Sequence, residues 1–458
     1  MESEILNLSK HELENALKDG RITVCVVGLG RIGLPTAALF ADAGAQVIGV
    51  DKSLEVVRGV NAGKCRFEDE PGLDRLVESC SQRGRLKAEV DFTSAVGKAD
   101  VVVICVPTPA NENGGPSYSA IIDASENVGR ALRKGSLVIV ESTVSIGTVE
   151  KIVVPLLERH SGMKAGKDFG VASCPERANP TQILRSMRTV PRIVGGIDFR
   201  STEVAARIHK MVFGVKVFKV RDPKTANAIK LIENSFRDVN IAFVNEIAVL
   251  CEKLGLDVLE VINGCATKWN FLPHYPGVGV GGACLPTSSL YLIAEGTDAD
   301  FTTRLVKTAR EVNDMMPSHA VTLVTEGLDT VNKILRGSKI AVLGASYKPD
   351  LHDLRGTPIE LVYHDLKEKG ASLAIYDPLF KGEQVFGHRA SETLNEAVEN
   401  ADCILIGTAH KEFEEMKLAT LARISKMPAV LVDVANVVDP KEAKRQGFLY
   451  RGVGRTHV

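Results

Sequence analysis

Short, almost continuously apolar runs alternate with amphipathic stretches over the N-terminal part of the chain. The apolar runs lie at 22–27, 46–50, 100–106, 136–140 and 169–173. Such runs are typical of strands buried on both faces of a parallel sheet, and the stretches between them suit crossover helices. The pattern therefore predicts an N-terminal α/β lobe.

The middle of the chain has a different pattern. Between Thr225 and Lys253 there is no proline or glycine, and apolar residues recur at helical spacing. We predict one helix over residues 223–254, about 45 Å long at a rise of about 1.5 Å per residue. A second amphipathic stretch follows, so this helix would form a spine between two lobes or the seam of a dimer.

The alternating pattern returns after about residue 330. Apolar runs lie at 339–343, 372–376, 401–406 and 429–434. The predicted fold class is therefore α/β, with two Rossmann-like doubly wound lobes joined by a long central helix and a helical middle domain. We place the three domains at residues 1–210, 211–325 and 326–458.

The composition excludes several classes of function. Of the 458 residues 45% are hydrophobic and 25% charged, and the net charge of −1 gives no reason to expect binding to nucleic acid or an anionic membrane. No apolar run reaches the ~18 residues of a membrane span, and the acidic N-terminus, Met1 to Glu4, has no signal-peptide pattern. The nine cysteines are scattered without CxxC spacing, which predicts reduced thiols, no metal and a cytoplasmic protein.

A glycine-rich turn follows the first predicted strand and reads Gly28-Leu29-Gly30-Arg31-Ile32-Gly33. In a dinucleotide site the first glycine permits the turn, the second admits the pyrophosphate, and the third allows close helix–strand packing. Asp51 ends the next strand, where a carboxylate accepts the ribose hydroxyls and repels a 2′-phosphate. We predict NAD binding, against the alternative of a turn that binds no nucleotide. Lys52 slightly weakens the preference for NAD over NADP.

A second glycine-rich segment, residues 277–284, ends in Cys284. Its four glycines let the backbone approach a ligand closely, because no Cβ stands in the way. A thiol at the end of such a loop is poorly placed for core packing and well placed to attack a bound ligand. The alternative is a free structural thiol.

Two further patterns carry candidate chemistry. Lys230 and Asn234 lie four residues apart on the predicted long helix and so share one face, within a mostly apolar segment. Glu176 follows an apolar run in Cys174-Pro175-Glu176-Arg177. From the pattern alone, the lysine could stabilise an oxyanion or be merely solvated, and the glutamate could be a general base or a loop charge.

Several segments occur together in the order of a known family. They are VVGLGRIGLP around Gly28, VPTP at 106–109, ESTVSIGT at 141–148, CPERANP at 174–180, PRIVGG at 191–196, KLIENSFRDVNIAFVNE at 230–246, GVGVGGAC at 277–284 and LGASYKPDLHDLRGTP at 343–358. Over about residues 20–455 the chain resembles the UDP-glucose/GDP-mannose dehydrogenase family of nucleotide-sugar 6-dehydrogenases.

The resemblance implies oxidation of a sugar C6 alcohol to a carboxylate with two NAD. Cys284 would add to the C6 aldehyde and carry a thiohemiacetal and then a thioester. Lys230 and Asn234 would stabilise the oxyanion and hold the reacting water, Glu176 would be the general base, and Thr143 would position water near the nicotinamide.

The resemblance also implies binding roles. NAD would contact the glycine turn, including Arg31 and Ile32, together with Thr108, Thr143 and Arg355 from the far lobe. The UDP-sugar would contact Glu176, Arg177, Lys230, Asn234, Lys268, Gly281 and Lys348. These assignments imply a C-terminal UDP-sugar lobe, an active site in the cleft between the lobes, and a homodimer formed through the long helix.

Three departures from the family are visible. Ser288 stands where an aspartate is usual, four residues after the cysteine. Lys268 matches an arginine that the family contributes to the neighbouring subunit's site, and lysine is the poorer bidentate partner. Residues 434–436 read Val-Ala-Asn near a position where an arginine is common.

Cys-Pro-Glu-Arg at 174–177 and Asn-Ser-Phe-Arg-Asp-Val-Asn at 234–240 are similar to the branch that acts on UDP-N-acetylhexosamines, especially N-acetylmannosamine. Arg177 and Arg237 would meet the acetamido carbonyl or a phosphate, or form ion pairs. The alternatives are a UDP-glucose 6-dehydrogenase, a two-electron dehydrogenase, which needs neither Cys284 nor a second nucleotide lobe, and a nucleotide-sugar sensor without turnover.

Overall fold

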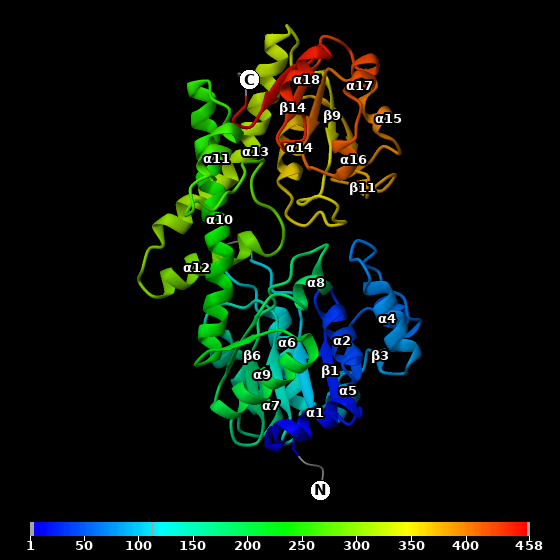
Figure 1. Ribbon diagram of the computed structural model, residues 1–458, viewed down its shortest axis with the longest axis vertical. Coiled ribbons are helices and arrows are strands. Elements are labelled where there is room, and N and C mark those ends of the chain that lie inside the picture. The colour runs from blue at the N-terminus through cyan, green and yellow to red at the C-terminus, as the bar shows by residue number, and fades with distance from the viewer. Residues whose placement is uncertain (1–3, 112–113, 456–458) are drawn as a thin grey trace. The chain divides into compact units, whose positions relative to one another are not determined.

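The computed structural model describes residues 4–111 and 114–455, so the first three residues of the acidic N-terminus lie outside the described residues. The chain divides into two compact units, Met1–Glu233 with Leu290–Ala299, and Asn234–Ser289 with Asp300–Val458. Both boundaries fall inside continuous helices, α10 (Pro223–Leu254) and α12 (Leu285–Asp298). The single helix predicted over residues 223–254 is therefore confirmed (Figure 1).

The first unit holds an eight-stranded sheet in the order β3-β2-β1-β4-β5-β6-β7-β8, parallel except for the β6–β7 pair. Its strands are β1 (Thr23–Val27), β2 (Gln46–Val50), β3 (Leu86–Glu89), β4 (Val101–Ile104), β5 (Leu137–Val140), β6 (Gly170–Ser173), β7 (Arg192–Gly196) and β8 (Val217–Lys219). Its helices are η1 (Ile5–Asn7), α1 (Lys10–Lys18), α2 (Gly33–Asp42), α3 (Leu54–Asn61), α4 (Leu73–Gln82), α5 (Phe92–Lys98), α6 (Ser119–Ala131), the π-helical turn η2 (Val149–Val153), α7 (Val154–Ser161), α8 (Ile183–Met187) and α9 (Phe199–Phe213). The strand order reverses between β1 and β4, which is where doubly wound sheets bind ligands.

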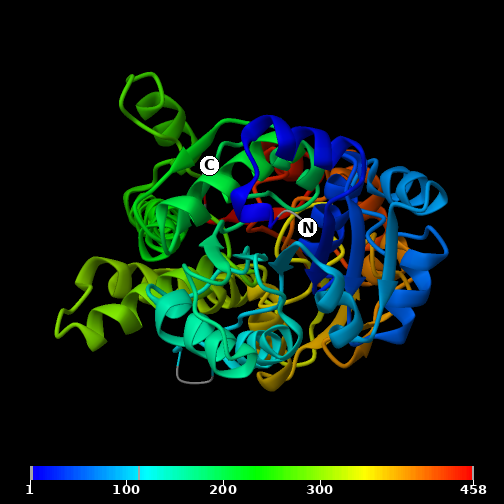
Figure 2. The same ribbon diagram turned by 90° about the horizontal axis from the view of Figure 1, so that it is seen from below.

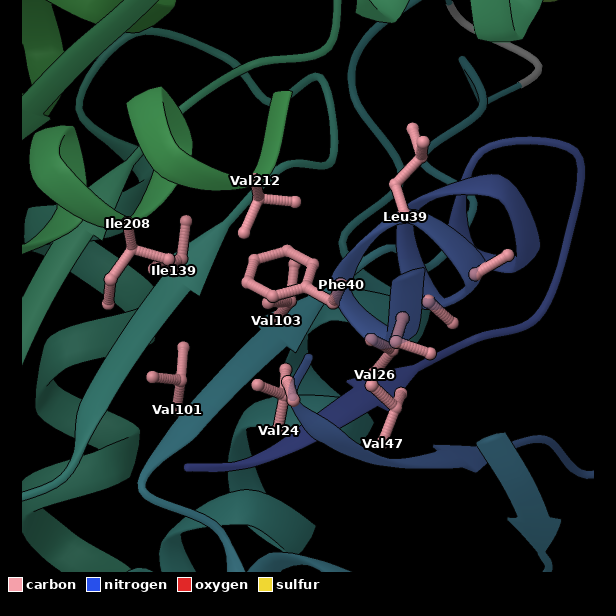
Figure 3. Packing of buried hydrophobic residues seen from close by; sticks show 14 of the residues in the cluster. Val24, Val26, Leu39, Phe40, Val47, Val101, Val103, Ile139, Ile208 and Val212 are labelled. Atoms are coloured by element: carbon pink, nitrogen blue, oxygen red, sulfur yellow. The ribbon is translucent and has the colours of Figure 1, made fainter. Parts of the chain in front are cut away.

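Both faces of this sheet are buried, as the apolar runs predict. Val24 and Val26 of β1 face the cluster formed with α1, α2, α4 and α9, whereas Cys25 and Val27 face the cluster formed with α5, α6 and α7. Figure 2 shows the N-terminal helix in blue and the teal helices on opposite sides of the strands. On the first face Phe40 of α2 lies among strand and α9 side chains such as Val103 and Val212 (Figure 3).

The second unit holds a five-stranded parallel sheet in the order β10-β9-β13-β14-β15 and a short hairpin of β11 and β12. Its strands are β9 (Lys339–Leu343), β10 (Ser372–Tyr376), β11 (Gln384–Val385), β12 (His388–Arg389), β13 (Cys403–Ile406), β14 (Val430–Asp433) and β15 (Leu449–Gly452). Its helices are α11 (Val258–Cys265), α13 (Arg304–Thr330), α14 (Pro358–Glu368), α15 (Leu394–Val398), α16 (Lys411–Glu414), α17 (Leu418–Ile424) and α18 (Pro440–Arg445). This sheet also has buried strands on both faces, so the two predicted doubly wound lobes are confirmed.

In the described part of the chain, no helix is both long enough and apolar enough to cross a membrane.

Candidate active site

The turn after β1 has the geometry that its glycines predict. Gly28 has a φ of +91°, which disfavours other residues. A Cβ on Gly33 would lie 1.8 Å from the carbonyl oxygen of Gly28, so only glycine allows this approach of α2 to the turn. A Cβ on Gly30 would meet nothing within 4 Å, which leaves this side of the turn open to a ligand, and Ile32 leads directly into α2.

Asp51 lies beside this turn at the carboxyl end of β2. Its Oδ2 accepts the N–H of Leu29 at 2.9 Å and its Oδ1 accepts the N–H of Ser53 at 2.9 Å. The carboxylate is thereby fixed and half-exposed next to the open glycine, where it can accept ribose hydroxyls. Lys52 forms an exposed ion pair with Asp123 at 2.8 Å, so its charge is partly compensated. The turn, the α2 N-terminus and Asp51 fit a dinucleotide.

Arg31 of the same turn is held by acidic residues that the sequence patterns did not identify. Its Nη1 donates to Asp69 at 2.8 Å and to Glu70 at 3.2 Å. Glu70 is buried and also accepts the N–H groups of Thr181 and Ile183 at 2.7 and 3.0 Å. Arg31 therefore connects the glycine turn to the segment that follows Glu176 and Arg177.

The loops after β4 and β5 carry Thr108 and Thr143, and the structure brings them together. The Thr108 hydroxyl donates to the carbonyl oxygen of Thr143 at 2.5 Å. The buried Tyr291 of α12 donates its hydroxyl to the carbonyls of Thr108 and Pro109 at 2.8 and 3.1 Å. Burial raises the pKa of Tyr291 far above its usual range, so it remains a donor. Nothing in the sequence pattern linked this tyrosine to the two threonines.

Glu176 is buried just beyond the end of β6, and both of its oxygens have partners. Arg192 donates from Nη1 to Oε2 at 2.5 Å, and the N–H of Arg177 donates to Oε1 at 2.7 Å. Each carboxylate oxygen can accept two hydrogen bonds, so the group retains capacity for a substrate proton.

Arg177 forms an ion pair, which is one of the two alternatives predicted for it; the other is contact with the acetamido carbonyl or a phosphate. Its guanidinium grips Glu233 of α10 with three contacts of 2.7–3.0 Å and donates to the carbonyl of Pro191 at 2.8 Å. Lys230 lies one turn before Glu233, with its Nζ 4.0 Å from Oε1. Glu233 therefore contacts two predicted substrate-binding cations, although the sequence analysis gave it no role within the motif at 230–246.

In the second unit, the glycine loop before Cys284 is built for close approach. Gly279 and Gly282 have φ angles of +111° and +87°. A Cβ on Gly281 would lie 2.7 Å from the Gly356 carbonyl oxygen and 2.7 Å from Pro358 and from Tyr347. Cys284 follows directly, exposed, at the start of α12.

Most of the other cysteines are buried or partly buried. Of the cysteines in the described residues, only Cys265 and Cys284 are exposed. Burial raises the pKa of Cys105 well above its usual range, and Cys25 and Cys403 are shifted in the same direction for the same reason. Because the thiolate is the attacking form, these buried thiols are unreactive.

Ser288, which departs from the family, joins Cys284 to Asn234. Its hydroxyl donates to the Cys284 carbonyl at 2.8 Å and accepts the amide N–H of Asn234 at 2.9 Å. Ser288 is fully buried, so both contacts are shielded from water. The serine therefore orients Asn234 and closes the first turn of α12.

A buried polar network lies behind this contact. Ser289 donates to Oδ2 of Asp238 at 2.7 Å, and Asp238 Oδ1 accepts from Arg310 and Asn313 at 2.8 and 2.9 Å. Asn245 donates to Asn313 at 2.9 Å and accepts the N–H of Gly277 at the start of the glycine loop. The network thus anchors the chain on both sides of Cys284.

The other predicted residues of this unit lie on loops. Arg355 is exposed and chelates Asp353 at 2.6–3.1 Å; hydrogen bonding to Asp353 raises its pKa, and the negative charge of a Cys284 thiolate acts in the same direction. Lys348 lies in the segment after β9, and Lys268 is exposed in the turn after α11. Asn436, near the position of the missing arginine, donates to the Pro276 carbonyl at 3.0 Å.

A doubly wound sheet with a dinucleotide turn defines the class of a nucleotide-dependent dehydrogenase, and a separate glycine-rich loop in the second unit ends in an exposed thiol. The sequence matches all three domains of the UDP-glucose/GDP-mannose dehydrogenase family: the NAD binding domain over residues 22–213, the central domain over 224–315 and the UDP binding domain over 341–440.

Two relatives share most of their length with this chain. A UDP-N-acetyl-D-mannosamine dehydrogenase of Pyrococcus horikoshii is 35% identical over 439 residues, which is 95% of this chain and 100% of that protein. One of Campylobacter jejuni is 37% identical over 406 residues, 86% of this chain and 97% of that protein.

Two solved structures have the same fold. The UDP-D-ManNAc dehydrogenase from Pyrococcus horikoshii has a TM-score of 0.89 at 34% identity, covering 95% of this chain and 100% of its own. An NDP-N-acetyl-D-galactosaminuronic acid dehydrogenase from Methanosarcina mazei has a TM-score of 0.83 at 33% identity, covering 98% and 99%. The chain belongs to the UDP-glucose/GDP-mannose dehydrogenase family and is an NAD-dependent UDP-sugar 6-dehydrogenase.

We expect Asp51→Asn to reduce the preference for NAD over NADP about tenfold, equivalent to about 1.4 kcal/mol. The substitution removes the charge that repels a 2′-phosphate and one of two acceptors. The measurement is the ratio of kcat/KM for the two cofactors. Asp74→Asn, an exposed carboxylate on α4, is the control, and an unchanged ratio in Asp51→Asn would show that Asp51 is not the ribose ligand.

We expect Ser288→Ala to lower kcat roughly tenfold with little change in the KM of the sugar, because a buried hydrogen bond that orients Asn234 is lost. Ser288→Asp keeps an acceptor for Asn234 and adds the carboxylate usual in the family, so its kcat should equal or exceed that of the wild type. Thr297→Ala, on the exposed end of α12, is the control. Wild-type kcat in Ser288→Ala would show that this contact does not serve turnover.

Proposed function

We propose that this protein oxidises the C6 hydroxyl of a UDP-N-acetylhexosamine, with UDP-N-acetylmannosamine the favoured substrate, to the uronic acid. The observation that carries the proposal is the exposed Cys284, which follows a loop with a close-approach glycine and is tied through Ser288 to Asn234. A covalent site of this kind suits a four-electron oxidation, because it retains the aldehyde between two hydride losses.

The choice of sugar rests on two supports. Relatives that are 35% and 37% identical bear the name UDP-N-acetyl-D-mannosamine dehydrogenase. The segment Cys174 to Arg177 has the form of the N-acetylhexosamine branch, and Arg177 is held by Glu233 in a fixed orientation beside Glu176.

In the first oxidation Glu176 accepts the proton of the C6 hydroxyl. NAD, when bound, accepts one hydride from C6 in each oxidation. The Cys284 thiolate then adds to the aldehyde carbon, and the alkoxide that forms is stabilised by the ammonium of Lys230 and the amide of Asn234 until it takes a proton as the thiohemiacetal. Loss of the second hydride, together with loss of the hydroxyl proton to Glu176, leaves a thioester on Cys284, and Glu176 releases each proton to solvent before it accepts the next.

Hydrolysis completes the reaction. A water molecule held at Thr143 loses a proton to Glu176 and adds to the thioester carbon. The C–S bond then breaks, the sugar leaves as the carboxylate, and the sulfur regains its thiol state. In this proposal Gly281 allows the loop to approach the sugar, while Lys348, Lys268 and Arg355 contact the bound nucleotides or the sugar.

The proposal predicts two NADH for each molecule of UDP-N-acetylmannosamine consumed. In Cys284→Ser we expect carboxylate formation to fall by at least about a thousandfold, since the covalent step is lost, while NAD binding survives. The measurements are NADH absorbance and product analysis with a panel of UDP-sugars. Cys265→Ser, the other exposed thiol, is the matched control and should retain activity.

The outcomes separate the alternatives. Two NADH with UDP-glucose alone would keep the mechanism and overturn the choice of sugar. One NADH per sugar would indicate a two-electron dehydrogenase. No NADH with any sugar would favour a binding protein, and unchanged carboxylate production in Cys284→Ser would exclude the covalent route.

We also propose that two copies associate through α10. Phe236, Phe243 and Leu250 are spaced by seven residues and are 54%, 57% and 49% exposed in the single chain. Heptad spacing places them on one face of the helix, and an apolar face of this kind is typical of helix–helix association.

We expect the wild type to have a mass in solution of about twice 49.3 kDa and Phe243→Glu to be monomeric, because a buried glutamate would lack a partner. Light scattering after size exclusion measures both. Leu361→Glu, an equally exposed residue of α14, should remain dimeric. A monomeric wild type, or a dimeric Phe243→Glu, would contradict the proposal.

A further inference from the structure

Four charged side chains are buried together at the carboxyl ends of β5 and β6 and beside β7 and α9. Glu141, Glu176, Arg192 and His209 are 1%, 7%, 1% and 0% exposed. Their formal charges cancel when the histidine is protonated. Buried ion clusters of this kind contribute little net stability, because desolvation offsets the attraction. Stability alone therefore does not account for this cluster.

His209 belongs to this buried cluster and contacts Glu141. Its Nδ1 lies 2.9 Å from the carbonyl oxygen of Ala205, which can only accept, so Nδ1 carries a proton. Its Nε2 lies 3.0 Å from Oε1 of Glu141. Burial opposes the charged form, but Cys174 and Glu141 outweigh it and raise the pKa of His209 to about 10.

Glu141, Cys174 and His209 bring three metal-type ligand atoms within 4.8 Å of one another. They do not suit a cation, because the guanidinium of Arg192 lies 3.9 Å from Oε1 of Glu141 and both histidine nitrogens are engaged with acceptors. The cluster is instead an ion network in which the cations come from protein side chains.

The side chain of Arg192 forms one hydrogen bond, and its acceptor is Glu176. Nη1 donates to Oε2 of Glu176 at 2.5 Å, whereas Nε and Nη2 are buried without a hydrogen-bond partner among the described residues. The guanidinium lies over the ring of Phe213, 3.9 Å from its centroid, which fixes its plane. Two unsatisfied donors are a cost to folding, so this arrangement favours orientation of Glu176 over stability.

We propose that Arg192 is a positioning residue for the oxidation, which holds the carboxylate of Glu176 in one orientation and supplies its counter-charge, while Glu141, paired with His209, lies on the other side of Arg192. The inference rests on the proposed function, in which Glu176 accepts protons. The N–H of Arg177 fixes the second oxygen, so the remaining acceptor positions of Glu176 have a defined direction.

The charge of Arg192 has a consequence for pH dependence. The titratable groups that face it are Glu141 after β5, Cys174 and Glu176 after β6, His209 of α9, and Cys105 after β4. Without the guanidinium, Glu176 would share a buried site with the like charge of Glu141. Its carboxylate would then be protonated at a higher pH, since a nearby cation favours the charged form and a nearby anion disfavours it.

The test is Arg192→Gln, which keeps hydrogen-bonding capacity and removes the charge. We expect kcat near neutral pH to fall at least about tenfold, the acid limb of the kcat profile to move up by about one pH unit, and the KM of the UDP-sugar to stay within about threefold. Arg192→Lys restores the charge and should return the limb toward the wild type. Arg188→Gln, an exposed arginine four residues away, is the matched control.

A double-mutant cycle with Glu176→Gln separates orientation from general damage. Because a neutral amide needs no counter-charge, Arg192→Gln should cost little further activity in the Glu176→Gln background. Additive losses, or a lower kcat with an unmoved acid limb, would overturn the role of Arg192. Thermal unfolding and NADH binding show whether Arg192→Gln folds. If it does not fold, the pH profile of Arg192→Lys is the test. This variant keeps the charge, so an acid limb that moves up by about one pH unit would contradict the proposal.

The same data distinguish this inference from the function on which it rests. If none of the UDP-sugars supports NAD reduction by the wild type, both the proposed function and the positioning role are contradicted. An active wild type whose Arg192→Gln variant has the wild-type pH profile would end only the positioning role.

Discussion

Parallel strands that are buried on both faces leave polar chemistry to the strand ends, and this constraint governs both units of the protein. Asp51, Asp377 and Asp433 each end a strand or follow it directly, and each accepts backbone N–H groups of a nearby loop. Asp433 accepts the N–H groups of Ala435 and Val438 so deep in the second unit that burial raises its pKa to about 6. These three acidic residues at strand ends therefore organise nearby loops by accepting backbone N–H groups.

Both sheets have a glycine turn after their first strand and an aspartate that accepts an N–H group from this turn, but the two aspartates differ in exposure. Gly28 and Gly344 both have positive φ after the first strand of their sheet, at +91° and +86°. Asp51 accepts an N–H from the first turn at 2.9 Å, and Asp377 accepts one from Ala345 at 2.8 Å. Asp377, however, is fully buried and bound to His410 at 3.0 Å, so it has a structural role, whereas the half-exposed Asp51 remains available to a ribose. The same turn geometry therefore leaves an accessible carboxylate in the first unit and a buried one in the second.

Local pattern predicted the parts of the structure that depend on local physics. Strands at 46–50, 339–343 and 372–376 and the helix at 223–254 agree with the structure, because apolar periodicity and the absence of helix breakers act over short distances. The supporting residues could not be predicted in this way. Tyr291 reaches a carbonyl 183 positions away, and Glu295 pairs with Ser145 across 150 positions. Arg192 appeared in the sequence only as part of a family motif, since its role depends on strand order, which brings β7 beside β6.

The serine at position 288 changes which carboxylate can manage protons. In the second unit Asp238 is saturated by Ser289, Arg310 and Asn313 and fully buried, so it cannot replace the aspartate that the family usually carries four residues after the cysteine. Ser288 itself has both of its hydrogen-bonding roles filled by Cys284 and Asn234 and has no basicity to offer. Proton transfer in the proposed reaction therefore falls on Glu176 alone among the assigned carboxylates. An enzyme that relies on one carboxylate for two oxidations and a hydrolysis needs that group ionised at every turnover. This need gives a physical reason for the buried guanidinium of Arg192, whose one side-chain hydrogen bond goes to Glu176.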